Sequence, residues 1–475
     1  MLLFVLFLTG TESCRIGENR SPRKLAKAYC GVCHRLPDPG SLTKDVWKNN
    51  IMPKMSGYYN WTEVSQFRYA NKGIFQQPGT IPMSDTIWAE LQDYFVSGGL
   101  EAPMVRVYDD LPIQSYFEVR QVDNICTKRG ITAVALDEEH HNILAGCDSQ
   151  LLTINLQGLL LKSSNSGGLI SGIFPKDLST AYILDPGFLD PHNEALGALK
   201  VWNKTTDKIE TIHEGLQRPV HLSRSGNNIF ISEYGDETGG LGQLQLVSKE
   251  YLNAAKLPGV YKSFIFDYDK DGNDEIIVLF AQAMEGVYVR EVDILNKHFG
   301  QLLSFVPEWG ISDMDTTDVN HDGWTDLVVV NGDNADFSII PKAYHGVRVY
   351  LNNQHGGYEE SYSFPMHGAS QVRTLDANGD GFDDLLVGAY FAEDERDQLL
   401  LLLHNGNPKD LDYLPQRIAE ANLGRWMVIN KGDVDGDGDL DAVIGSFVIS
   451  KKSSSINIKG AKDQTNLLLL LNKSK

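Results

Sequence analysis

The sequence has no run of 18 or more apolar residues, so no segment of it is expected to cross a membrane as a helix. It is also short of basic residues, because 42 Lys and Arg stand against 63 Asp and Glu and give a formal charge of −21. This balance argues against a role that depends on contacts with nucleic-acid phosphates. Gly-x-Ser-x-Gly, P-loop and dinucleotide-binding motifs are absent. With 42% hydrophobic and 22% charged residues, the 475 residues describe a globular chain of two or three domains, or of one domain built from repeats.

The chain begins with eight almost wholly apolar residues, MLLFVLFL. Such a run is too short to span a bilayer but suits the apolar core of a secretory signal. The stretch resembles a bacterial lipoprotein signal in which Cys14 is lipidated, and whether this cysteine carries lipid stays open. We therefore expect residues 1–20 to be an export segment with a linker, and the protein to be extracytoplasmic.

Cysteine is rare, with five residues in the chain. Cys126 and Cys147 lie 21 residues apart at the start of the large C-terminal region. In an oxidising compartment they would form a disulfide, while a pair of buried thiols is equally compatible with the sequence.

Two more cysteines belong to the motif Cys30-Gly31-Val32-Cys33-His34. Two thiols about one helical turn apart can each form a thioether with a haem vinyl group, and the following histidine supplies an iron ligand. A redox dithiol or half of a zinc site are the rivals, but no second Cys-x-x-Cys exists. The motif therefore predicts one covalent haem c, held by Cys30 and Cys33 with His34 on the iron.

Around this motif, residues 21–103 have the pattern of a small helical domain. Helix starts are predicted at Ser21-Pro22, Thr43 and Ser84, and Gly98-Gly99 ends the last helix. Three short helices around this haem motif resemble a class I cytochrome c. That resemblance implies a methionine as the second iron ligand, with Met55 as the first candidate and Met83 and Met52 in reserve.

A nine-residue loop occurs four times in the second half, with starts separated by 51, 58 and 57 residues. Each copy has oxygen-bearing side chains at positions 1, 3 and 5, glycine at position 6 and a carboxylate at position 9, which is the donor set of a calcium loop. Positions 1, 3, 5, 7 and 9 are Asp267, Asp269, Asp271, Asn273 and Glu275 in loop 1; Asp318, Asn320, Asp322, Trp324 and Asp326 in loop 2; Asp376, Asn378, Asp380, Phe382 and Asp384 in loop 3; and Asp433, Asp435, Asp437, Asp439 and Asp441 in loop 4.

These loops are not EF-hands, because position 12 carries Val or Ile in place of the bidentate glutamate. A β-type run follows each loop, so each loop is expected to feed a strand. Several carboxylates within nine residues repel one another strongly unless a cation lies between them. The repeat therefore predicts about four bound Ca²⁺ ions.

The loops and the Gly388-Ala389-Tyr390 and Gly445-Ser446-Phe447 sequences resemble the FG-GAP, or VCBS, repeats of integrin α-subunit propellers. Three plain units precede them, beginning near Gly130, Gly168 and Pro219, so seven units fill residues 130–475. We expect a mainly β fold, a seven-bladed β-propeller, with the helical domain before it. Residues 104–129 are the connector, and its first part, to residue 125, is a candidate for a strand that closes the ring.

The whole chain resembles exported bacterial proteins, common in Bacteroidetes and Planctomycetes, that join a haem-binding motif to VCBS repeats. Shared short segments include Arg218-Pro219-Val220-His221 and Lys342-Ala343-Tyr344-His345-Gly346. Asp333, Asp336, Tyr344 and His345 are weak candidates for a catalytic site, and hydrogen bonds that fix a loop are the simpler interpretation.

Three functions compete at this point. The first is single-electron transfer, with the propeller as a docking scaffold for a redox partner that has a basic patch. The second is a haem-coupled dehydrogenase that oxidises a sugar or alcohol in the propeller channel, and the third is calcium-dependent adhesion or glycan binding. The expected location is the periplasm or the surface of a Gram-negative bacterium.

Overall fold

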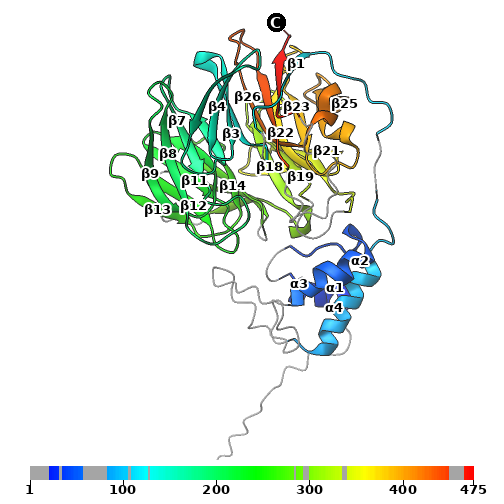
Figure 1. The fold of residues 1–475 in the computed structure, drawn as a ribbon. Helices are drawn as coiled ribbons and strands as arrows, with labels where there is room; N and C mark the ends of the chain where they lie inside the picture. Colours follow the sequence, from blue (N-terminus) through cyan, green and yellow to red (C-terminus); the bar gives the residue numbers. More distant parts are fainter. Residues whose placement is uncertain are drawn as a thin grey trace, which may run out of the picture.

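The computed structural model describes residues 21–31, 35–56, 83–104, 108–126, 129–282, 285–292, 299–333, 340–448 and 465–474. A small helical part lies at one end of a large β-propeller (Figure 1). Cys14, Cys33, His34 and Asp336, which the sequence marked as candidate functional residues, lie outside the described residues. Within these ranges, none of the helices combines the length and the apolar character that crossing a bilayer requires.

In the described residues, 28 strands form seven four-stranded antiparallel sheets, each a blade. Blades 1 to 3, which the sequence predicted as plain units, contain β2 (Ile131–Asp137), β3 (Asn142–Cys147), β4 (Gln150–Asn155) and β5 (Leu160–Asn165); β6 (Gly172–Pro175), β7 (Thr180–Asp185), β8 (Gly197–Asn203) and β9 (Ile209–Leu216); and β10 (Pro219–Ser225), β11 (Asn228–Glu233), β12 (Gly240–Gln245) and β13 (Tyr251–Ala255).

Blades 4 to 7 each contain one of the four loops. They consist of β14 (Val260–Phe266), β15 (Glu275–Phe280), β16 (Gly286–Glu291) and β17 (Gly300–Ser304); β18 (Ile311–Thr317), β19 (Asp326–Asn331), β20 (Gly346–Asn352) and β21 (Tyr358–Pro365); β22 (Ala369–Leu375), β23 (Asp384–Ala389), β24 (Leu399–His404) and β25 (Tyr413–Arg417); and β26 (Trp426–Gly432), β27 (Asp441–Ser446), β28 (Leu467–Asn472) and β1 (Phe117–Val122). The predicted seven-bladed propeller is confirmed.

The ring is closed by strand β1 from the connector. β1 pairs antiparallel with β28, from Phe117 opposite Asn472 to Val122 opposite Leu467. The last blade therefore contains strands from both ends of the propeller sequence, as predicted for a closing strand in the connector. This pairing leaves β28 inside its sheet, which explains why Leu467–Leu471 is an unbroken apolar run that is buried throughout.

The core consists of apolar clusters between neighbouring blades. One cluster joins β19 and β20 to β22–β24 and includes Val328, Val349 and Leu400, none of which is exposed. Burying a side chain of this size contributes about 1.5–3 kcal/mol, so each blade depends on its neighbours for most of its stability.

The helical part contains α1 (Pro22–Tyr29), η1 (Pro39–Ser41), α2 (Lys44–Val46), the π-helical turn η2 (Trp47–Ile51), α3 (Met52–Ser56) and α4 (Asp85–Gly98). The three predicted helix starts are confirmed. The Thr43 and Ser84 side chains accept hydrogen bonds from Val46 N at 3.4 Å and from Ile87 N at 3.3 Å, and Ser21 precedes α1 without a side-chain cap. Trp47 is buried at the centre, where its ring packs 4.7 Å from that of Phe95.

The helical part contacts the propeller at blades 4 and 5. Arg35 donates from Nη1 to the backbone oxygen of Ser304 at 3.1 Å, and Ser41 Oγ donates to Glu308 Oε1 at 3.2 Å. Ile340 and Tyr344 of the propeller pack against the apolar core of the helices. Among the described residues, polar and apolar contacts thus join the two parts.

A disulfide links Cys126 to Cys147 and joins the connector to strand β3. We expect its reduction to cost about 3 kcal/mol of unfolding free energy, because the link closes a loop of about 20 residues in the unfolded chain. Denaturant unfolding with and without a reductant measures this cost. The Cys126→Ala/Cys147→Ala variant should match the reduced protein, and equal stability of all three forms would contradict the expectation.

Candidate metal-binding loops

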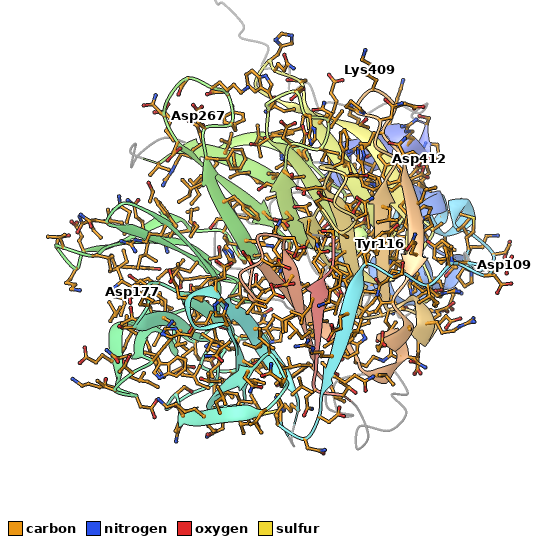
Figure 2. The ribbon with its side chains drawn as sticks, turned by 90° about the horizontal axis from the view of Figure 1, so that it is seen from above. Asp109, Tyr116, Asp177, Asp267, Lys409 and Asp412 are labelled. Atoms are coloured by element: carbon orange, nitrogen blue, oxygen red, sulfur yellow. A yellow bond between two sulfur atoms is a disulfide. The ribbon has the colours of Figure 1, made fainter. Side chains whose placement is uncertain are left out.

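The four loops lie at the same end of the propeller. Each joins the first strand of its blade to the second, as residues 267–274 do between β14 and β15. Since strands alternate in direction within an antiparallel blade, all first turns share one end of the ring. Figure 2 looks onto this end, where Asp177 and Asp267, each from the first turn of its blade, are labelled. The helical part contacts the other end, through the segments that precede β18 and β20.

The loop backbone curls around the carboxylate at position 1. Glycine at position 6 adopts φ of 92° in loop 1 and 84°, 91° and 90° in loops 2, 3 and 4, a conformation that other residues rarely adopt. Its N–H donates to Oδ2 of the position 1 aspartate at 2.9, 2.8, 2.9 and 3.1 Å in loops 1 to 4. All four loops therefore share one backbone fold.

The predicted ligands converge in this fold. In loop 1, carboxylate oxygens of Asp267, Asp269 and Asp271 lie within 4.8 Å of one another, and in loop 4 those of Asp433, Asp435 and Asp441 do so. Three negative charges at this spacing repel one another unless a cation or protons neutralise them. Position 7 is Asn, Trp, Phe or Asp, which fits a ligand that uses only its backbone carbonyl.

The carboxylate at position 9 is buried at the start of the second strand. In loop 2, Asp326 accepts from Val319 N at 3.0 Å through Oδ2 and from Asn352 N at 2.8 Å through Oδ1. Asp384 and Asp441 accept the equivalent pairs of hydrogen bonds. Burial, together with the neighbouring loop carboxylates, raises the pKa of Asp326, Asp384, Asp441 and Glu275 to about 7 each. A bound cation would keep these groups ionised.

This arrangement predicts how pH affects the calcium-free protein. A raised carboxyl pKa means that the folded chain holds its protons more tightly than the unfolded chain, whose pKa values lie near 4. Stability is therefore lost as pH rises from about 4 to about 7 and stays low above that. We expect the chelated protein to have a higher Tm at about pH 5.5 than at about pH 8. A calcium-loaded sample melted at both pH values is the control, and a chelated Tm that rises with pH would contradict the expectation.

The haem motif is described only in part. Cys30 follows α1 and packs, half-buried, against the apolar core of the helices, as do Met55 and Met83. Met52 is 2% exposed inside that core, where it fills space. Arg35, the first described residue after the motif, is hydrogen-bonded to the propeller. Cys30, Met55 and Met83 thus all contact one apolar cluster. A cysteine thiol and a methionine thioether are the types of donor that a haem c site uses, so these residues fit such a site.

Of the catalytic candidates among the described residues, Tyr344 packs against the helical part, and Asp333 N donates to the backbone oxygen of Gly310 at 3.0 Å. Tyr344 donates its hydroxyl to the backbone oxygen of Glu308 at 2.8 Å. His345 is buried, lies 5.2 Å from the parallel ring of His367 and accepts from Gly368 N at 3.4 Å through Nδ1. Burial holds the pKa of His345 well below its usual value. These contacts fix a loop, and they support the simpler of the two interpretations.

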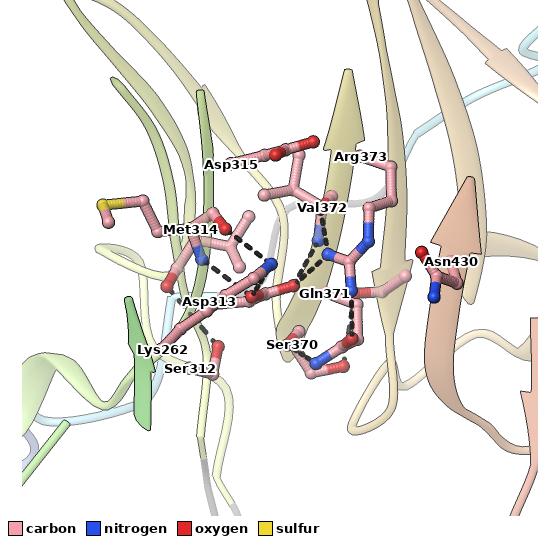
Figure 3. A network of polar contacts seen from close by, with 12 residues as sticks. Lys262, Ser312, Asp313, Met314, Asp315, Ser370, Gln371, Val372, Arg373 and Asn430 are labelled. Carbon is pink, nitrogen blue, oxygen red and sulfur yellow. Dashed lines mark hydrogen bonds and ion pairs between the residues drawn. The ribbon is translucent and has the colours of Figure 1, made fainter. Parts of the chain in front are cut away.

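A charged network around the propeller axis was not anticipated from the sequence (Figure 3). Lys262 of β14 and Arg373 of β22 both form ion pairs with Asp313 of β18, which is 1% exposed. Lys431 of β26 contacts Asp315 at 2.9 Å. The partners in each of these ion pairs come from innermost strands of different blades and are 51 or more positions apart in the chain, so no local motif marked them. Their mutual pairing points to a structural role in joining blades 4 to 7.

Comparison with known proteins shows which proteins this chain resembles. Residues 318–387 match the FG-GAP-like repeat. Integrin alpha-V of Gallus gallus is 25% identical over 255 residues, which cover 48% of this chain and 23% of that protein. Integrin alpha-7 of Mus musculus is 24% identical over 273 residues, 54% of this chain and 21% of that protein. Among solved structures, the WD40 domain of Pan2 from Neurospora crassa has a TM-score of 0.48 and 11% identity, over 77% of this chain and 98% of that one.

The match to the repeat begins at loop 2, covers β19, β20 and β21 of blade 5, and continues through β22 and loop 3 into β23 of blade 6. The matched region spans less than a quarter of each integrin chain. The protein therefore contains an FG-GAP repeat within a seven-bladed β-propeller, and that propeller resembles integrin alpha chains.

Proposed function

We propose that this protein is an extracytoplasmic, calcium-dependent binding protein whose propeller recognises a protein partner. The observation that carries the proposal is the set of four loops with one backbone fold at one end of the ring, within a propeller that resembles integrin alpha chains. Each loop offers oxygen donors alone, which is the preference of Ca²⁺. Calcium holds blades 4 to 7 in the binding form by neutralising their loop carboxylates.

Charge indicates the kind of partner. Four Ca²⁺ ions would bring the formal charge from −21 to −21 + 8 = −13, so the protein stays acidic and favours a partner with a basic patch. Of the aromatic side chains at position 7, the Phe382 ring lies between His321 and His404, and Lys270 Nζ lies 4.3 Å from the centre of the Trp324 ring. Both faces of the Phe382 ring are thus unavailable for stacking on a sugar ring, which favours a protein over a glycan as the partner.

An extracytoplasmic location is part of the proposal. The Cys126–Cys147 disulfide forms and persists in oxidising compartments. The apolar start of the sequence and the calcium loops agree with this location, since the millimolar calcium outside the cytoplasm fills even weak sites.

Binding is tested on immobilised matrix proteins and on a glycan array, with calcium and with a chelator. We expect calcium-dependent binding to at least one protein probe, and its loss in a variant with Asp318→Asn and Asp322→Asn in loop 2. Lys249→Asn, in the turn between β12 and β13 of blade 3 and outside the four loops, is the control and should bind as the wild type does. Binding that is unaffected by calcium, or confined to glycans, would contradict the proposal.

Electron transfer is the second candidate, favoured by Cys30-Gly31-Val32-Cys33-His34 at the end of α1. Cys30 and Cys33 would hold a haem c, His34 would bind its iron, and Met55 or Met83 would supply the other axial ligand. Such a group supplies single-electron chemistry. The propeller, which is hydrogen-bonded to Arg35 directly after the motif, would then bind the redox partner.

A visible spectrum of protein made in a host that attaches haem c tests this candidate. We expect c-type bands whose intensity is lost in the Cys30→Ala variant. A panel of sugars and alcohols is added before dithionite, because reduction by one of them would indicate a dehydrogenase. Absence of c-type bands in the wild-type protein would contradict the haem assignment and, with it, both electron transfer and the haem-coupled dehydrogenase.

A further inference from the structure

The four loops are joined to one another in series by side chains that are not predicted ligands. Loop 1 contacts loop 2 through Lys270, whose Nζ lies 4.3 Å from the centre of the Trp324 ring. Loop 2 contacts loop 3 through His321, whose ring stacks on Phe382 at 4.2 Å with 4° between the planes. Lys270 and His321 both occupy position 4, and Trp324 and Phe382 both occupy position 7. The same pair of positions therefore makes both contacts.

Loop 4 replaces this pair with a different contact. Position 4 of loop 3 is Gly379, which has no side chain to stack, and Ser474 lies against it. Ser474 Oγ donates to Oδ2 of Asp439, the position 7 residue of loop 4, at 3.2 Å. The third junction thus joins the same two positions through a residue near the C-terminus.

A second set of contacts ties each loop to the next through the third strand of the blade. Asn352 N donates to Asp326 of loop 2, while Asn352 Nδ2 donates to Tyr268 O of loop 1 at 3.0 Å. Asn472 N donates to Asp441 of loop 4, while its Nδ2 donates to Asp376 O of loop 3 at 2.9 Å. One residue therefore touches the buried carboxylate of its own loop and the backbone of the preceding loop.

Loops 2 and 3 are joined in this second set by a hydroxyl. Thr317, directly before loop 2, donates to a carboxylate oxygen of Asp383 in loop 3. The series ends at blade 1, where His141 Nδ1 contacts Val434 O of loop 4 at 2.7 Å and Glu138 accepts from Asp433 N at 3.2 Å. Blade 1 has no such loop, so its turn is a fixed support for the series.

We propose that the four loops bind calcium cooperatively, because an ion that orders one loop also positions the contacts that order the next. This inference rests on the proposed calcium binding. An ion bound to one loop fixes the backbone on both sides of positions 4 and 7 of that loop. The next loop, whose side chain contacts one of these fixed positions, then has less conformational freedom to lose when its own ion binds. The loop end of blades 4 to 7 then responds to calcium concentration as one unit.

Calcium titration of the chelated full-length protein by calorimetry tests the coupling. The wild type should bind about four ions with a Hill coefficient above 1. Emptying loop 2 with Asp318→Asn and Asp322→Asn should weaken the remaining sites by about 5-fold. Unchanged affinity at those sites would overturn the proposal.

A second variant separates coupling from ligand loss. Lys270→Asn and His321→Asn together remove both stacking contacts without touching a predicted ligand, and asparagine tolerates the positive φ of 59° and 56° found there. We expect the full number of ions with a Hill coefficient below that of the wild type, because the contacts of Ser474, Asn352 and Asn472 remain. Lys249→Asn, at φ of 61° in a turn of blade 3, is the matched control and should keep the wild-type coefficient. A double variant that titrates like the wild type would contradict the coupling, whereas a wild type that binds no calcium would overturn the proposed function itself.

Discussion

We expect chelation of calcium to lower the unfolding free energy of the propeller by about 2.7 kcal/mol for each loop that binds an ion, at a free calcium concentration of 100 times Kd. The physical reason is that ions bound to the folded loops have no equivalent site in the unfolded chain, where the backbone no longer holds the ligands of each loop in one arrangement. The effect is the largest expected here because four loops act on the same ring. Thermal or denaturant unfolding in calcium and in a chelator measures it.

The control for this experiment removes the side chains that are predicted to bind calcium, instead of removing the calcium itself. A variant with asparagine at Asp267, Asp318, Asp376 and Asp433, the position 1 ligands, should have nearly the same stability with and without calcium. Magnesium at the same concentration should restore less stability than calcium, since it prefers a smaller octahedral site and keeps its water. Equal midpoints of the wild type in calcium and in chelator would contradict the expectation.

Asp313→Ala costs about 3–5 kcal/mol, because it leaves the cations of Lys262 and Arg373 buried without their shared partner. Asp313 Oδ1 also accepts from Met314 N at 2.9 Å, and Oδ2 accepts from Val372 N at 3.2 Å. The substitution therefore removes the contact that joins β14, β18 and β22 at the axis (Figure 3). Denaturant unfolding in excess calcium isolates this cost from that of the loops.

Asp394→Ala is the matched control for this substitution. Asp394 pairs with Arg396 on the surface and its side chain accepts from Arg396 N at 2.9 Å, so its loss should cost much less than that of the buried Asp313. A result in which both variants lose the same stability would show that the axis network is no more important than a surface pair.

The sequence allowed the parts of this structure that depend on local patterns to be predicted. The four loops follow from spacing within nine residues, and the blade number follows from their period and from three plain units of strand, turn and strand. The connector, up to residue 125, was a candidate for the strand that closes the ring, and β1 lies there. Each of these features is indicated by short segments of consecutive residues, and for this reason it could be predicted.

Contacts between distant residues could not be predicted in the same way. Asn352 gave no signal in the sequence, although it joins loops 1 and 2 through its backbone and its side chain. Lys262, Asp313 and Arg373 come from three blades and meet only because their strands are innermost. The contact of the helical part with Glu308 likewise depends on the closed ring.

The number of calcium ions bound to each chain tests the central claim most directly. It is measured by equilibrium dialysis of the chelated full-length protein against calcium, followed by elemental analysis of calcium and protein in the same sample. We predict about four ions for each chain, and about three after Asp318→Asn and Asp322→Asn empty loop 2. A wild-type chain that retains less than one ion at millimolar calcium would contradict the claim that these loops are calcium sites.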